Sequence, residues 1–182
     1  MPSKPPRQII RVVLALALVL ALPGAAAHAD TLEASVKSAF LLNFARFADF
    51  APAKFASPDA PLDICVLTPD PLEATLDDSL HGKTVKGHAV RVRRSDRPEL
   101  LRDCQLVFIA SRSGDLLDAQ LAKLSGFGVL TVHEASAARG AGVVRLFVED
   151  HHLRFEVNVA AAEREDIQMA AGLLEMAKRV RQ

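Results

Sequence analysis

The sequence predicts an α/β fold, a layered sandwich with a mostly parallel central sheet flanked by helices and an antiparallel C-terminal hairpin. Three observations support this prediction. Strand patterns alternate with helical patterns through the middle of the chain, which is typical of a parallel sheet. Two of the strand patterns are apolar throughout, as in strands buried on both faces. The last third of the chain replaces the alternation with a hairpin pattern.

The N-terminal residues match a cleavable secretory signal. Three basic residues precede an unbroken apolar run, VVLALALVLAL, at residues 12–22, and small residues then end in an A-x-A site before Asp30. As a helix the run would extend about 16 Å, whereas a bilayer core is about 30 Å thick, which disfavours an uncleaved anchor. We therefore predict a signal peptide at residues 1–29, one domain at residues 30–182 and a periplasmic location.

The first helix of the domain is predicted over residues 35–50. Phe40, Phe44 and Phe47 recur at helical spacing, and only a narrow polar stripe interrupts the apolar positions. A helix this apolar is usually buried on more than one side. We expect it to pack on the domain's own core, with a partner chain as a second candidate for contact.

Strands and helices alternate from residue 62 to residue 132. Strands are predicted over residues 62–67, 89–93, 104–110 and 128–132. Helices are predicted over residues 72–80, with Asp70 as N-cap, and over residues 116–124, with Ser113 as N-cap. A final helix is predicted from about Ile167 to Val180, with an inner face of Ile167, Ala170, Ala171, Leu174 and Ala177.

The hairpin has a register that the sequence specifies well. A two-residue turn at Asp150-His151 places Arg145 opposite Glu156 on one face. The other face is then wholly apolar, with Val144, Leu146, Val148, Leu153, Phe155 and Val157. A slip of one residue would destroy both patterns. A type I′ turn needs positive φ at both central residues, which His adopts with some strain.

The chain has two cysteines, Cys65 and Cys104. In an exported protein an even pair indicates a disulfide, and closure of this long loop would contribute about 4 kcal/mol to stability. Two buried thiols acting as small apolar side chains are the alternative. The sequence has no C-x-x-C motif, so oxidoreductase chemistry is not indicated.

Catalytic and metal-binding constellations are missing from the sequence. The G-x-S-x-G nucleophile motif and the phosphate-binding loop are absent. His151 and His152 are adjacent on a strand and would point to opposite faces, which disfavours a shared metal ion. Lys+Arg and Asp+Glu both number 22, and a zero net charge argues against a nucleic-acid binder. We predict a protein that is not an enzyme, with no catalytic residues, no cofactor and no metal.

One basic cluster stands out, at Arg91, Arg93, Arg94 and Arg97. Basic residues on a solvated edge strand deter edge-to-edge pairing. The alternative is an electrostatic contact with an acidic partner.

Several stretches, in a fixed order, resemble the YfiR family. Residues 36–47, VKSAFLLNFARF, are similar to the family's opening V-K-A-A-[YF]-L-x-N-F-x-[KR]-[FY]. The later stretches are ICVL at 64–67 followed by DPL, GKTVKGH at 82–88 leading into RVRR, CQLVFI at 104–109, and residues 142–158, which end in RFEVN before three alanines. Together they span nearly the whole chain after the predicted signal.

This resemblance implies an exported, non-catalytic regulator. In the family's best-known system the repressor engages the periplasmic part of YfiN, an inner-membrane diguanylate cyclase, and an OmpA-like outer-membrane lipoprotein, YfiB, relieves the repression. The resemblance also implies control of cyclic-di-GMP and of biofilm formation. It implies a homodimer as well. Cys65 and Cys104 sit where the family's reference member has one cysteine pair, whereas that member's second pair, in the hairpin region, is missing here.

The expected contact surfaces are the first helix, the basic strand, the hairpin face and the last helix. The candidate partner-binding residues are Phe40, Phe44, Phe47, Arg91, Arg93, Phe147 and Arg154. A periplasmic small-molecule binding or sensory domain is the alternative function, because the carboxyl ends of parallel strands form crevices in this architecture.

Overall fold

The computed structural model describes residues 24–67, 73–111, 113–134 and 142–182. Residues 34–182 form one compact unit and residues 1–33 another. Most of the predicted signal peptide, and the predicted N-cap Asp70, lie outside the described residues. Within the described residues, no helix combines the length and the apolar character that crossing a membrane requires.

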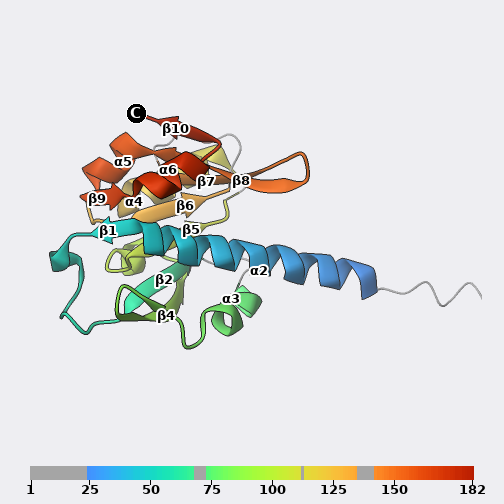
Figure 1. Cartoon of the computed structure of the whole chain (residues 1–182), viewed down its shortest axis with the longest axis horizontal. Coiled ribbons are helices and arrows are strands. Elements are labelled where there is room, and N and C mark those ends of the chain that lie inside the picture. Colours follow the sequence, from blue (N-terminus) through green and yellow to red (C-terminus); the bar gives the residue numbers. More distant parts are fainter. Residues whose placement is uncertain (1–23, 68–72, 112, 135–141) are drawn as a thin grey trace, which may run out of the picture. The chain divides into compact units, whose positions relative to one another are not determined.

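An eight-stranded sheet forms the centre of the compact unit, in the order β10-β8-β7-β6-β5-β2-β4-β3 (Figure 1). Its strands are β2 (Leu62–Leu67), β3 (Thr84–Val85), β4 (His88–Ser95), β5 (Leu106–Ile109), β6 (Leu130–His133), β7 (Val144–Glu149), β8 (His152–Asn158) and β10 (Arg179–Arg181). The five strands β4, β2, β5, β6 and β7 are mutually parallel, and β7 and β8 form an antiparallel hairpin. The predicted fold class is confirmed.

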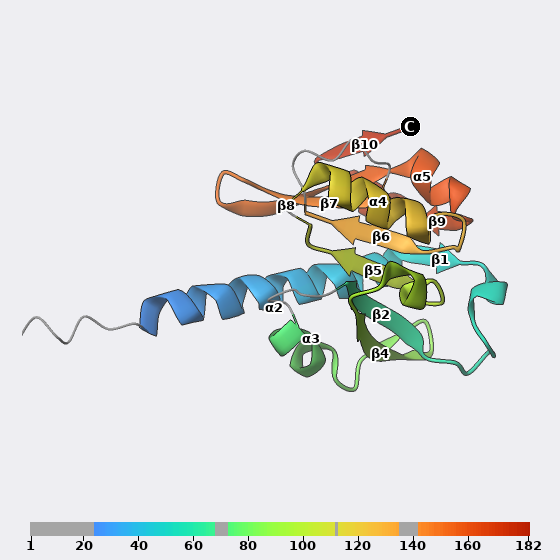
Figure 2. The same cartoon turned by 180° about the vertical axis from the view of Figure 1, so that it is seen from behind.

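Helices cover both faces of this sheet (Figures 1 and 2). They are α2 (Gly24–Phe47), α3 (Glu73–Leu80), α4 (Gly114–Leu124), α5 (Val159–Arg164) and α6 (Ala171–Met176), with short 3-10 turns η1 (Pro52–Lys54) and η2 (Pro98–Leu101). One apolar cluster joins α2, α3, α5 and α6 to one sheet face, and a second joins α4 and η2 to the other. The two clusters make a three-layer α/β/α arrangement.

Helix α2 is anchored to the sheet by aromatic contacts. Phe44 is fully buried, and its ring centroid lies 5.1 Å from that of Phe155 on β8. The helix ends at Phe47, three residues before the predicted end, because Ala48–Phe50 forms strand β1. This strand pairs antiparallel with β9 (Ile167–Met169), and the backbone carbonyl of Phe47 accepts a hydrogen bond from the amide of Ala170.

The predicted hairpin register is confirmed at every pair. Arg145 lies opposite Glu156, and Leu146 opposite Phe155. Asp150 and His151 have φ values of 51° and 60°, so both turn residues adopt the left-handed conformation that a type I′ turn requires. In the middle of the chain, the strand predicted at residues 62–67 and the N-cap Ser113 are also confirmed; the Ser113 hydroxyl accepts a hydrogen bond from the amide of Leu116.

The predicted final helix over residues 167–180 is wrong. That segment is divided into strand β9, the short helix α6 and strand β10. Tertiary pairing overrides the helical pattern, because β9 finds β1 as a partner and β10 adds to the sheet beside β8. Of the predicted inner face, Ile167 is buried but Ala171 is exposed, and the buried leucine of α6 is Leu173 instead.

A polar cluster fixes the turn between α4 and β6. The Lys54 ammonium group donates to the backbone carbonyls of Arg102 and Phe127, at 2.6 Å each, and burial lowers the pKa of Lys54 to about 8. The Glu165 carboxylate accepts from the amides of Gly126 and Gly128, both of which have positive φ. The segments that carry Lys54, Arg102 and Glu165 are thereby linked to the turn at residues 126–128.

A disulfide joins Cys65 on β2 to Cys104, which precedes β5, across a sequence separation of 39 residues. Both residues are fully buried in the apolar cluster beneath α4. Of the two alternatives left open by the sequence, the structure has the bridge.

Removing the bridge by the double substitution Cys65→Ala and Cys104→Ala should lower the free energy of unfolding by about 4 kcal/mol, because the unfolded chain regains the entropy of the closed loop. Urea unfolding with and without a reductant measures this loss. The reductant should destabilise the wild-type protein and leave the double variant unchanged. Two alkylatable thiols in the folded, unreduced protein would contradict the bridge.

Candidate functional site

The three phenylalanines proposed for partner binding occupy different positions. Phe44 lies inside the core, and its side chain is inaccessible to a partner. Phe40 and Phe47 are half-buried and pack against the same apolar cluster. Phe40 makes an edge contact with Phe155, at 6.0 Å between ring centroids. The apolar face of α2 is therefore used mainly by the domain itself.

The arginines of β4 are paired with carboxylates of their own chain. Arg91 makes two hydrogen bonds to Asp63, at 2.6 and 2.8 Å, and Arg93 bridges Asp63 and Asp103. The Asp63 carboxylate is almost fully buried, and the hydrogen bond to it raises the pKa of Arg91. Arg94 pairs with Asp77. Much of the charge on this strand is neutralised within the protein.

Phe147 and Arg154 face each other across the hairpin, near its tip. The hairpin projects beyond the rest of the sheet (Figure 1). Arg154 is exposed and Phe147 half-buried, whereas Val148 on the other face is 66% exposed. The tip therefore presents aromatic, aliphatic and cationic groups to solvent.

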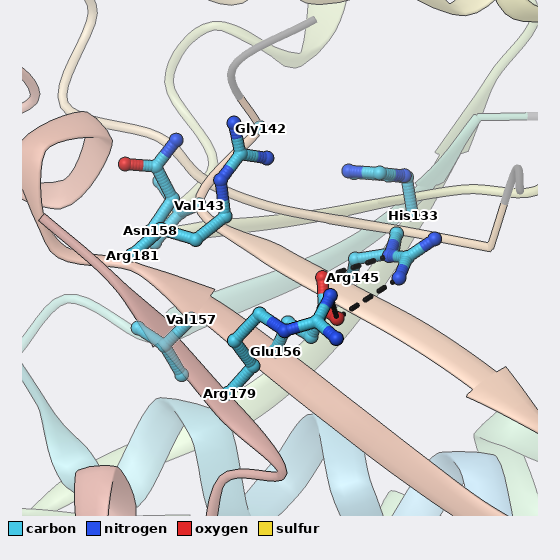
Figure 3. A pocket seen from close by; sticks show the side chains of 9 residues that line it. All are labelled: His133, Gly142, Val143, Arg145, Glu156, Val157, Asn158, Arg179 and Arg181. Atoms are coloured by element: carbon cyan, nitrogen blue, oxygen red, sulfur yellow. Dashed lines mark hydrogen bonds and ion pairs between the residues drawn. The ribbon is translucent and has the colours of Figure 1, made fainter. Parts of the chain in front are cut away.

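A cavity of about 280 Å³ lies beside strands β6, β7, β8 and β10 (Figure 3). We call it the arginine pocket. Its polar lining consists of His133, Arg145, Glu156, Asn158, Arg179 and Arg181. The sheet register places four of these side by side, because His133 pairs with Arg145, Arg145 with Glu156 and Glu156 with Arg179.

Glu156 is the centre of this row. Its side chain is only 7% exposed, and its carboxylate is bound by Arg145 at 3.0 Å and by Arg179 at 2.8 Å (Figure 3). Arg145 also lies over the ring of Phe147, 4.9 Å from the ring centroid. The Arg181 side chain forms no ion pair or hydrogen bond with any residue that the structure describes.

His133 forms one wall of the arginine pocket. The imidazole is buried, and within the described part of the chain its Nδ1 atom has no hydrogen-bond partner. Burial and the neighbouring positive charge of Arg145 lower its pKa to about 4, against the opposing influence of Asp118 and Glu156. The ring packs against Gly142, where a Cβ atom would lie 2.6 Å from the His133 Cδ2 atom. Only glycine permits that approach.

Sequence reasoning missed most of this pocket. It identified the pair of Arg145 and Glu156 from the hairpin register. Because a helix was predicted over residues 167–180, strand β10, which carries Arg179 and Arg181, was not expected. Their alternation around Val180 was a strand signal. Among the described residues, no group of three or more His, Cys, Asp or Glu side chains is arranged to hold a metal ion.

The His133→Asn substitution should reduce the acid sensitivity of the fold. An unfolded histidine has a pKa of about 6.5, so between that pH and about 4 the unfolded chain binds a proton that the folded chain does not. The contribution is complete above pH 6.5 and falls as the pH is lowered. From pH 7 to pH 5 the wild-type protein should lose about 2 kcal/mol more stability than the variant, as measured by urea unfolding. An NMR titration of the His133 ring near pH 6.5 would contradict this.

Comparisons with known proteins identify the family of this chain. A comparison with curated proteins found no match. Among solved structures, an ABC domain in complex with L-Trp from Streptococcus pneumonia matches with a TM-score of 0.52 and 8% identity, over 77% of this chain and 61% of that one. At this identity the likeness shows the fold alone. The family model described as YfiR/HmsC-like matches residues 34–178, nearly the whole compact unit. The chain therefore belongs to the YfiR/HmsC-like family of periplasmic regulators.

Proposed function

We propose that this protein is an exported regulator that represses a membrane-bound diguanylate cyclase through the cyclase's periplasmic part. Cyclic-di-GMP synthesis, and with it biofilm formation, would fall while the complex persists. The observation that carries the proposal is the YfiR/HmsC-like match over residues 34–178. A binding protein rather than an enzyme also agrees with the sequence, in which the nucleophile and phosphate-loop motifs are missing.

The hairpin tip is the surface that best fits such a partner. Phe147 and Arg154 supply an aromatic and a guanidinium group, and both residue types are enriched at protein interfaces. On the opposite face the exposed Val148 pairs with the half-buried Leu153. A tip of this kind can insert between elements of a partner, with apolar groups on one side and a cation on the other.

The other candidate surfaces support the proposal less well. Phe44 belongs to the core, so a substitution there would test folding rather than binding. Arg91 and Arg93 already have carboxylate partners, and a partner's acidic groups would have to compete with Asp63. The half-buried Phe40 and Phe47 could contribute at the edge of an interface.

The mechanism we propose is a population shift. A cyclase with active and inactive conformations is held inactive when the regulator binds the inactive form more tightly. An OmpA-like outer-membrane lipoprotein that bound the same regulator would reduce the free concentration available to the cyclase and relieve repression. We also propose a homodimer as the state that engages the membrane partner. The buried disulfide suits a protein that works outside the reducing cytosol.

Deleting the gene should raise cellular cyclic-di-GMP and biofilm mass, and the purified protein should retain the periplasmic domain of a membrane diguanylate cyclase from the same organism in a pull-down. The charge reversal Arg154→Glu should weaken that binding by about tenfold or more, because it places a carboxylate at the proposed contact. The Arg164→Glu substitution, on the exposed end of α5, is the matched control and should bind as the wild type does.

Unchanged cyclic-di-GMP after deletion, together with no binding to any such periplasmic domain, would overturn the proposed function. Equal weakening by the two charge reversals would keep the function but remove the hairpin tip as its contact surface.

A further inference from the structure

We propose that the arginine pocket is a binding site for a small oxyanion, the carboxylate or phosphate group of a periplasmic metabolite. This inference rests on the pocket alone and does not depend on the proposed repression of a cyclase. Four features of the pocket support it: the charge of the lining, its free hydrogen-bond donors, a buried polar atom without a partner and the size of the cavity.

The lining carries an excess of positive charge. Arg145, Arg179 and Arg181 contribute three positive charges, against a single carboxylate at Glu156. His133 is held neutral at pH 7 and adds none. The remaining charge of two units lines one cavity and makes its potential positive. An anion would neutralise it.

Hydrogen-bond donors remain available after the internal contacts are made. Both oxygens of Glu156 are occupied by Arg145 and Arg179. The Arg181 side chain is free of partners within the described chain and extends along the cavity towards Gly142 (Figure 3). The Asn158 side-chain oxygen caps α5 by accepting from the amide of Ala161, which leaves its amide nitrogen as a donor. The unused groups are mostly donors, which suits an oxyanion and disfavours a cation.

A polar atom of the wall is buried and has no partner. Nδ1 of His133 makes no hydrogen bond within the described residues, although the residue is only 3% exposed. Such a group costs free energy unless something satisfies it. As the neutral ring can carry its proton on either nitrogen, the buried Nδ1 atom can donate to, or accept from, a buried water. Gly142 keeps the ring in place, because any side chain there would displace it.

The size of the cavity limits the ligand. Sites for drug-sized ligands span about 300–1,000 Å³, and this one measures about 280 Å³. A short dicarboxylate or a small phosphate ester fits this volume. The guanidinium groups bind the planar carboxylate or the phosphate through paired N–H donors. Because the two chemistries share these donors, an experiment has to distinguish them.

Isothermal titration calorimetry of the protein, expressed from its full-length sequence, tests the proposal with two probes, inorganic phosphate and succinate. At least one should bind with a Kd between about 10 μM and 1 mM at low ionic strength. The Arg181→Gln substitution should raise that Kd by about tenfold or more. Since Arg181 is exposed and unpaired, this variant should fold normally, as circular dichroism can verify. The matched control Arg164→Gln removes an exposed arginine at the end of α5, outside the pocket, and should leave Kd unchanged.

Binding of succinate alone assigns the pocket to carboxylates, and binding of phosphate alone assigns it to phosphates. The Gly142→Ala substitution gives a second readout, because displacing the His133 ring should weaken whichever probe binds. No heat from either probe at about 10 mM, or equal affinities for the wild type and Arg181→Gln, would overturn the proposal.

Discussion

The packing of α2 on one face of the sheet is the contact on which the rest of the structure depends. Phe44 of the helix meets Phe155 of β8 inside a cluster that also contains Ile64 and Val132 of the central strands. Because side chains alternate along a strand, burying Phe155 under α2 sends its neighbour Glu156 to the other face. Burial of aromatic surface thus decides where the charged row of the hairpin lies. A register slip would place Glu156 against the helix, at a high desolvation cost.

The opposite face is covered unevenly, and this creates the pocket. Helix α4 and the disulfide bury the apolar side chains of β2 and β5, with Leu117, Leu121 and Leu124 supplying the helix surface. That cluster contains no residue of β7, β8 or β10. On those strands the row of Arg145, Glu156 and Arg179 takes the place of an apolar layer. A buried carboxylate between two guanidinium groups satisfies its own charge, but it leaves the surrounding positive charge in excess.

The sequence was most informative where local pattern and tertiary environment agree. A nearly continuous apolar run identified β2 with its correct limits, although the buried Asp63 interrupts that run. The hairpin register followed from the alternation on both sides of Asp150-His151. The helix prediction for the C-terminal segment was wrong because local pattern and tertiary environment disagree there. Its alanines and leucines favour a helix locally, while β9 and β10 exist only because β1 and β8 offer partners far away in sequence. The pocket was not predicted either, because its lining includes Arg179 and Arg181 of β10.

The hairpin tip and the arginine pocket are built on the same two strands. Arg145 connects them directly, since its guanidinium group binds Glu156 in the pocket and lies over the ring of Phe147 towards the tip. An anion in the pocket would compete with Glu156 for Arg145 and so change the contacts of that ring. For such a ligand to alter partner binding, it must have different affinities for the free and partner-bound forms of the regulator. By linkage, the partner would then change the affinity for the anion by the same factor. Measuring the anion affinity with and without the periplasmic partner therefore decides whether the hairpin tip and the arginine pocket are independent or coupled.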